Sequence, residues 1–439
     1  MTQHFDLVIK SGTVMAPDGE NRMDIGLSNG LVAAMGDLTS ATADEIIDAT
    51  GCHVLPGAID TQVHFREPGN THKEDLEAGG KGAVLGGITA FCEMPNTNPT
   101  TVTAEALADK VKRATHRSPA DFAFFIGADA SNLDHLDDLV NNPGCVGVKI
   151  FMGSSTGSLL VKDDASVLRA LQSGKCRVAV HCEDEDRLIE RRATLADDCT
   201  VQDHPVWRDE ETALRATKRL VKLARQANRR IHVLHVTSAA EIKFLADHKD
   251  IATVECTPQH LTLAAPDCYE RLGTLAQMNP PIRSTHHRDA LWDGLTSGCV
   301  DVIGSDHAPH TLEEKGRDYP NTPSGMPGVQ TLLPIMLNHV NEGRLTLHRL
   351  TELIAVNPAA IYGMKNKGWL REGRDGDVTI VDMNREETIL NENMANLSGW
   401  TPFDGVRVRG WPVATIVRGF AAMRDGEIIG TPRGEALRF

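Results

Sequence analysis

The chain has 439 residues, of which 41% are hydrophobic and 24% are charged, an ordinary composition for a globular protein with more than one structural unit. Its formal net charge of −15 argues against nucleic acid as a main partner, because phosphate binding requires a basic surface. No run approaches the roughly 18 apolar residues of a membrane span, so we expect no membrane partner. The N-terminus lacks the features of a signal peptide, and the nine scattered cysteines include no Cys-x-x-Cys pair; both are typical of a cytoplasmic protein.

Both ends of the chain carry strand and turn patterns. Residues 5–9, 31–35 and 45–47 are short apolar or alternating runs, and the turn signals Asp18-Gly19 and Asn29-Gly30 lie between them. Residues 370–439 return to strands and turns of the same kind. We therefore expect residues 1–53 and 370–439 to form one small β-domain that flanks the rest of the chain.

Residues 54–369 alternate between short apolar runs and longer segments of helical periodicity. Segments such as 104–115, 166–173, 210–227 and 239–249 are amphipathic, and residues 330–364 predict closing helices. Eight strand–helix units in a row are typical of a (β/α)8 barrel, a TIM-type α/β fold, which we predict for this region. The runs predicted as barrel strands are residues 54–59, 88–94, 122–127, 146–152, 177–181, 230–236, 252–256 and 300–303.

Polar side chains stand at or just beyond the carboxyl ends of these strands, where (β/α)8 barrels carry their active sites. On the first strand Gln62, His64 and Arg66 are spaced two residues apart and therefore face the same way. Imidazoles together with a carboxylate on one rim indicate a zinc-type metal site with room for a water. The residues at these ends are His64, Arg66, Asn96, Lys149, His181, His235, Asp306 and His310.

Lys149 is the unusual member of this set. It is flanked by Val148 and Ile150, and a bare ammonium buried there would be costly. Two interpretations stay open. Lys149 could pair with a nearby carboxylate, or CO2 could have converted it to a carbamate, an anion able to bridge two metal ions.

Four stretches carry a resemblance to a known family. They are residues 64–69 (His-Phe-Arg-Glu-Pro-Gly), 94–99 (Met-Pro-Asn-Thr-Asn-Pro), 278–283 (Met-Asn-Pro-Pro-Ile-Arg) and 306–315 (Asp-His-Ala-Pro-His-Thr-Leu-Glu-Glu-Lys). With the residues at the strand ends, they resemble the amidohydrolase superfamily and, within it, the dihydroorotases, over essentially the whole chain. The resemblance implies a metal-dependent cyclic amidase that reversibly hydrolyses a small-molecule substrate, (S)-dihydroorotate, to N-carbamoyl-L-aspartate in pyrimidine biosynthesis. It also implies a homodimer.

The resemblance assigns a role to each matching residue. One or two Zn²⁺ ions per chain would be held by His64, Lys149 as a carbamate, His181, His235 and Asp306. Asp306 would also be the general acid and base that moves the proton of a metal-activated water. The substrate carboxylate would be held by Arg66, Asn96 and His310, and the pyrimidine ring by Asn279, Ser324 and Gly325.

Gln62 departs from the family pattern, in which the first strand carries His-x-His. A glutamine carbonyl is a poorer zinc ligand than an imidazole, so three outcomes stay open: two metals with one weakened position, one metal, or an inactive site. Two other functions also stay open. A hydantoinase-like or allantoinase-like amidase is disfavoured by Arg66 and Asn96, and a catalytically silent scaffold is favoured only by Gln62.

Other residues near the predicted site receive simpler interpretations. We expect His204 at the surface, residues 183–192 in a solvated charged helix, and His260 in a structural role near the seventh strand. The irregular segment 311–328 could close over the substrate or form a rigid loop ordered by its prolines.

Overall fold

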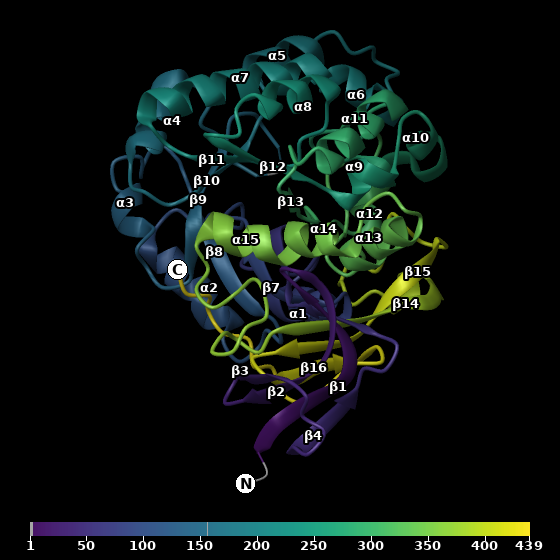
Figure 1. Ribbon diagram of the computed structural model, residues 1–439. Helices are drawn as coiled ribbons and strands as arrows, with labels where there is room; N and C mark the ends of the chain where they lie inside the picture. Colours follow the sequence, from purple (N-terminus) through teal and green to yellow (C-terminus); the bar gives the residue numbers. More distant parts are fainter. Residues whose placement is uncertain (1–2, 156) are drawn as a thin grey trace.

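The computed structural model describes residues 3–155 and 157–439, and these residues form two sheets. An 8-stranded parallel sheet curves into a nearly closed barrel with helices around it. A 9-stranded sheet built from both ends of the chain lies below the barrel in Figure 1. The predicted (β/α)8 barrel with an additional β-structure from both termini is therefore confirmed.

The barrel strands follow one another in chain order, and each pairs in parallel with the next. Each overlaps one of the apolar runs, because a strand that faces the barrel interior on one side and helices on the other is apolar on both faces. The strands are β6 (Ala58–Val63), β7 (Ile88–Glu93), β8 (Asp121–Gly127), β9 (Cys145–Phe151), β10 (Val178–His181), β11 (Ile231–Val233), β12 (Ala252–Cys256) and β13 (Val302–Ile303).

The longest helix shows how the sequence sets the helix ends. The Asp209 carboxylate accepts a hydrogen bond from Thr212 N in the first turn of α7, and Asn228 ends the helix in the left-handed conformation, with φ 49°. The helices are α1 (Leu76–Leu85), α2 (Ala104–Ala114), α3 (Leu136–Leu139), α4 (Asp164–Gln172), α5 (Glu185–Arg192), η1 (Val201–Asp203), α6 (His204–Trp207), α7 (Glu210–Ala227), α8 (Ala239–Ala246), α9 (Pro258–Thr262), α10 (Asp267–Leu272), η2 (Gly273–Ala276), α11 (Thr285–Thr296), α12 (Leu312–Lys315), α13 (Leu332–Asn341), α14 (Leu347–Thr351), η3 (Glu352–Val356), α15 (Asn357–Tyr362) and η4 (Asn391–Asn393).

The terminal sheet joins segments that are more than 300 residues apart, because β5 lies between β1 and β14. Asn29 and Gly30 both have positive φ and form the predicted two-residue turn between β2 and β3. The sheet reaches Pro56, slightly past residue 53 where the prediction ended it; the division into two domains stays a prediction. Its strands are β1 (His4–Ala16), β2 (Gly19–Ser28), β3 (Leu31–Gly36), β4 (Thr42–Asp48), β5 (His53–Pro56), β14 (Val378–Thr388), β15 (Arg407–Val417), β16 (Phe420–Arg424) and β17 (Glu427–Ile428).

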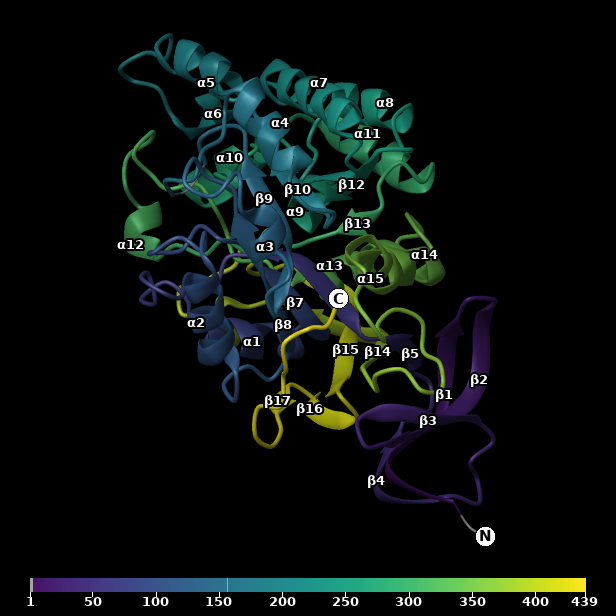
Figure 2. The same cartoon turned by 90° about the vertical axis from the view of Figure 1, so that its left-hand side faces the viewer.

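The barrel closes at the carboxyl ends of its first and last strands. His64 N donates to His307 O at 2.7 Å, and Ser305 N donates to Asp60 Oδ1 at 3.0 Å. Figure 2 shows α12, which follows β13, on one side of the barrel and α14 and α15 on the opposite side. The hydrogen bonds from His64 to His307 and from Ser305 to Asp60 bring the polar residues that follow β6 and β13 together. Within residues 3–155 and 157–439, no helix is both long and apolar enough to cross a membrane.

Candidate active site

One pocket at the carboxyl ends of the barrel strands collects nearly all of the predicted site residues. It contains about 340 Å³ of empty space, part of it open to solvent. His310 is the predicted residue that does not line it. The predicted site residues in its wall are His64, Arg66, Asn96, Lys149, His181, His235, Asn279, Asp306, Ser324 and Gly325, and Gln62 lies among them.

On one side of the pocket, His64 faces Asp306. His64 Nδ1 lies 2.7 Å from Asn96 Oδ1, and because that oxygen only accepts, Nδ1 carries the ring proton. Burial lowers the pKa of His64, so the ring is neutral and its Nε2 presents a lone pair. This Nε2 lies 3.2 Å from Asp306 Oδ1, which is also an acceptor. Two acceptor atoms at this distance repel each other unless a cation, a proton or a metal ion, lies between them.

In the same pocket wall, His181 faces His235. His181 Nε2 lies 2.8 Å from Glu183 Oε2 and therefore carries the proton, which leaves the lone pair on Nδ1. Nδ1 is 3.1 Å from His235 Nε2, and burial lowers the pKa of both rings. Two neutral imidazole nitrogens that converge in this way are a zinc-type ligand pair.

Lys149 lines the same pocket as these two pairs. Its Nζ is buried, has no hydrogen-bond partner and lies 4.5 Å from the centre of the Phe151 ring. The interpretation as half of an ion pair is therefore wrong, since no carboxylate of residues 3–155 and 157–439 contacts it. Burial lowers the pKa of Lys149 to about 7, which leaves a large share of neutral amine near neutral pH. A neutral amine is the form that reacts with CO2.

The donors around the pocket fit a metal. Two buried polar atoms in its wall that could face a metal lack a hydrogen-bond partner: Gln62 Oε1 and Lys149 Nζ. Buried polar atoms are almost always paired, so a cluster of exceptions points to a group that completes the site. Imidazole nitrogens and a carboxylate are the ligand types that zinc prefers.

Glu183 and Arg208 were not predicted as site residues. The interpretation of residues 183–192 as wholly solvated is wrong at Glu183, which is fully buried before α5 and contacts His181. Arg208 donates to it through Nε at 3.1 Å and through Nη2. Against the effect of burial, Arg208 and His181 lower the pKa of Glu183 to about 2. The His-x-Glu spacing of residues 181 and 183, which places both side chains on one side of an extended chain, was the available signal.

Arg66 is a buried cation that faces the pocket. Its Nε donates to Pro309 O at 3.2 Å, and its Nη2 lies 3.3 Å from His310 Nε2. Burial lowers the pKa of Arg66 to about 10, so the guanidinium stays charged at neutral pH. No carboxylate of the described residues lies within 4.0 Å of it. A buried, unpaired guanidinium is costly unless an anionic ligand completes it.

His310 lies behind Arg66. Its Nε2 lies 3.1 Å from Ser324 O, and its Nδ1 lies 3.2 Å from Lys73 Nζ. The proton is therefore on Nε2, and the ring connects the strand-end residues to the loop that carries Ser324.

Asn279 is oriented by a residue that the sequence placed elsewhere. His204 was expected at the surface, and this is wrong: it is fully buried at the start of α6. Its Nε2 lies 3.0 Å from Asn279 Oδ1 and 3.0 Å from Met278 O. The Asn279 oxygen is held from behind, so its amide nitrogen is the group left for the pocket. His260 has the predicted structural type of contact, 3.0 Å from Pro280 O.

The loop that carries Ser324 and Gly325 is anchored. Buried Lys315 donates through Nζ to Gln277 O, Pro323 O and Gly325 O at 3.0–3.1 Å. Gly325 has φ 138°, and a Cβ there would lie 2.4 Å from Ala308 O, so only glycine fits. These contacts favour the rigid-loop interpretation for this end of segment 311–328.

A second, open cavity adjoins the pocket and shares Ser155, Asn279 and Ser324 with it. It contains about 1040 Å³ of space, including open solvent. Leu188, Ile189, Trp207, Pro320 and Pro323 give it a largely apolar wall.

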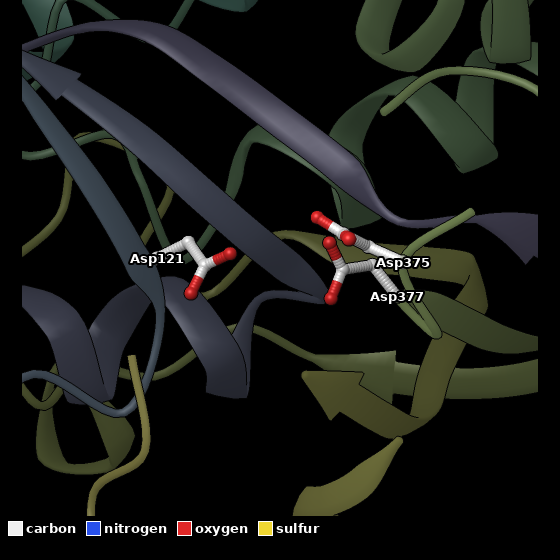
Figure 3. A group of neighbouring side chains, drawn as sticks. All are labelled: Asp121, Asp375 and Asp377. Carbon is white, nitrogen blue, oxygen red and sulfur yellow. The ribbon is translucent and has the colours of Figure 1, made fainter. Parts of the chain in front are cut away.

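A group of three carboxylates lies elsewhere, at the start of β8 and before β14. Asp121, Asp375 and Asp377 bring oxygens within 4.8 Å of one another, close enough for a metal ion (Figure 3). Lys367 Nζ, however, lies 2.6 Å from Asp121 Oδ2 and 3.0 Å from Asp375 Oδ2 and contacts Asp377. Although burial opposes it, Asp377, Asp121 and Asp375 raise the pKa of Lys367, which stays an ammonium. This ammonium takes the place of a metal ion.

This chain is similar to known amidohydrolases over nearly its whole length. Residues 53–422 match the model of the amidohydrolase family. A dihydroorotase from Pyrococcus furiosus is 36% identical over 94% of this chain and 92% of its own length. An allantoinase from Deinococcus radiodurans is 32% identical over 99% and 98%. The solved structure of an L-hydantoinase (dihydropyrimidinase) from Arthrobacter aurescens is similar with a TM-score of 0.94, 30% identity and 99% of each chain covered.

Proposed function

Because the chain belongs to the amidohydrolase family, we propose that it is a dihydroorotase, which reversibly hydrolyses (S)-dihydroorotate to N-carbamoyl-L-aspartate in pyrimidine biosynthesis. The chain is a cyclic amidohydrolase. The observation that carries the choice of substrate is Arg66, a buried guanidinium without a carboxylate partner among the described residues, in the wall of the pocket. Dihydroorotate carries a carboxylate on its ring, whereas hydantoin and allantoin rings do not.

The metal belongs to this proposal. His181 and His235 would hold one zinc ion, His64 and Asp306 a second position, and Lys149, as a carbamate, would lie between them. Bound zinc supplies Lewis-acid activation of a water and of the amide carbonyl. Glu183 and Asn96 keep the protons of His181 and His64 on the ring nitrogens that point away from these positions.

Asp306 moves the proton. Its carboxylate lies at the carboxyl end of β13 and accepts a hydrogen bond from Gln62 Nε2 at 3.0 Å. It takes the proton of the attacking water as the new C–O bond forms, and it delivers that proton to the ring nitrogen as the C–N bond breaks. In the reverse direction Asp306 takes the proton from the attacking ureido nitrogen and returns it to the departing oxygen.

The remaining residues hold and orient the substrate. Arg66 binds the ring carboxylate through its guanidinium, and His310 beside it donates to the carbonyl of Ser324. Asn279 donates through the amide nitrogen that His204 leaves exposed to the pocket, and Ser324 and Gly325 flank the ring from the anchored loop. Asn96 has two roles in the proposal: it contacts the substrate carboxylate, and its Oδ1 accepts a hydrogen bond from His64 Nδ1.

A hydantoinase-like or allantoinase-like amidase is the second candidate, and one observation favours it. The open cavity next to the pocket has an apolar wall that includes Trp207 and Ile189, and it has room for a bulky substituent on a neutral ring. Dihydroorotate does not need this space.

The deciding experiment compares substrates on one zinc-loaded preparation. We expect kcat/KM to be highest for dihydroorotate, with N-carbamoyl-L-aspartate formed, and carbamoyl aspartate to cyclise in the reverse assay. A higher kcat/KM for allantoin or for a 5-substituted hydantoin would refute the proposed substrate. No turnover of any cyclic amide by metal-loaded protein would leave the scaffold interpretation. A homodimer, taken from the resemblance, and a cytoplasmic location, expected from the scattered cysteines, complete the proposal.

A further inference from the structure

We propose that the two metal positions of this site are unequal: the His181/His235 position binds zinc tightly, and the His64/Asp306 position binds it weakly, because Gln62 supplies an amide that donates to Asp306 in place of an imidazole ligand. The inference rests on the metal dependence in the proposed function and not on the identity of the substrate.

The orientation of the Gln62 amide is the first observation. Its Nε2 lies 3.0 Å from Asp306 Oδ1. The opposite orientation would place an amide oxygen against a carboxylate oxygen at that distance, with no proton available between them. The side chain is 1% exposed, and its backbone is held by Asp60 Oδ1 on N and by Ser305 Oγ on O. The Nε2 that faces Asp306 has no lone pair available for a metal. Gln62 Oε1 has no hydrogen-bond partner, and an amide oxygen is a much poorer zinc ligand than the imidazole it replaces.

The second observation is that Asp306 Oδ1 is shared. It accepts from Gln62 Nε2 at 3.0 Å and lies 3.2 Å from His64 Nε2. A hydrogen bond to a carboxylate oxygen withdraws electron density from the atom that would bind the metal. The position is thus left with one imidazole, one weakened carboxylate oxygen and the amide oxygen of Gln62, besides Lys149. The other position has two imidazoles.

The groups behind the ligands add to the difference. His181 donates its other ring proton to the Glu183 carboxylate at 2.8 Å, and Arg208 holds that carboxylate in place. A carboxylate behind a histidine raises its basicity as a ligand, and this applies to His181 alone, since His235 Nδ1 has no hydrogen-bond partner. His64 instead has the neutral Asn96 amide behind it, at 2.7 Å. Since changes behind a ligand alone alter metal affinity by about 10–100-fold, we expect a difference of about 100-fold or more between the positions.

Zinc binding to metal-free protein in bicarbonate-containing buffer tests the inference directly, by competition with a chromophoric chelator and by metal analysis after gel filtration. We expect one tightly bound zinc per wild-type chain and a second with an affinity about 100-fold lower. Gln62→His is expected to make the second ion tight, because it restores the missing imidazole. Gln202→His adds an imidazole at an exposed glutamine and is the matched control, with wild-type binding expected.

If Gln62→His does not fold, the zinc affinity of the second position in Gln62→Ala tests the inference instead. Gln62→Ala removes the donor to Asp306 together with an amide oxygen that is at most a weak ligand, so the second affinity is expected to change less than tenfold. A tenfold or larger loss in Gln62→Ala would show that the amide does ligate and would overturn the inference. Two wild-type zinc ions within tenfold of each other in affinity would overturn it as well. One tight zinc without turnover of dihydroorotate would support the inference and count against the proposed substrate.

Discussion

Glu183→Gln is the substitution whose consequence the structure sets out most fully. The carboxylate is fully buried and accepts from His181 Nε2 at 2.8 Å and from Arg208 Nε at 3.1 Å, with a further bond from Arg208 Nη2. Glutamine has nearly the same shape but one acceptor oxygen. It can accept from His181 or from Arg208, and its NH2 group then opposes the other donor.

Two magnitudes follow from this geometry. The change weakens one or two hydrogen bonds to a charged group, each worth about 1.5–3 kcal/mol, and it also removes the desolvation cost of the carboxylate. We therefore expect the metal-free protein to lose about 1–3 kcal/mol of unfolding free energy. The loss of the carboxylate behind His181 should weaken zinc binding about 10–100-fold, or about 1.4–2.8 kcal/mol.

The assay measures zinc affinity by chelator competition and unfolding free energy by urea titration of the metal-free protein. Glu185→Gln is the matched control, because Glu185 is also buried nearby but accepts from Ser154 N and Oγ, at 2.6 and 2.7 Å, and not from a histidine. It should leave zinc affinity unchanged. A Glu183→Gln protein that folds and binds zinc as tightly as the wild type would refute the role given to Glu183.

Glu183 also predicts a pH effect on the metal-free protein. Its pKa is about 2 in the folded chain, below the ordinary glutamate value of about 4.3. A lowered pKa stabilises the fold above the unfolded value, and this contribution disappears as pH falls from about 4.3 towards 2. Glu183→Gln should therefore flatten the fall in stability over this range, and an unchanged acid profile would contradict the assignment.

Three further changes test the site. Asp306→Ala is expected to abolish turnover while the zinc held by His181 and His235 is retained, and near-normal activity would remove Asp306 from the mechanism. Arg66→Ala should raise the KM for dihydroorotate about 10–150-fold, the equivalent of one charged hydrogen bond of about 1.5–3 kcal/mol, with partial recovery in Arg66→Lys; an unchanged KM would contradict the carboxylate contact. With a pKa of about 7, Lys149 is roughly one-tenth neutral at pH 6 and nine-tenths at pH 8. The ¹³C carbamate signal of metal-free protein in ¹³C-bicarbonate should therefore grow over this range and be absent in Lys149→Ala.

The sequence alone determined the barrel and most of the pocket. Buried parallel strands need apolar residues on both faces, so β8, β9 and β12 stand out as runs that local periodicity detects. Because active sites of such barrels lie at the carboxyl ends of the strands, the polar residues that end these runs, such as His181 and Asp306, could be placed in one site before any contact was known.

Only the tertiary structure decided what each polar group contacts. His204 and Glu183 lie in charged stretches that are locally indistinguishable from surface, and both are buried because segments distant in the chain, with Asn279 and Arg208, pack over them. The proton positions on His64 and His181 follow from partners on other elements. The same holds for Gln62: its residue type shows that an imidazole is missing, but that its amide donates to Asp306 depends on how β6 and β13 meet when the barrel closes.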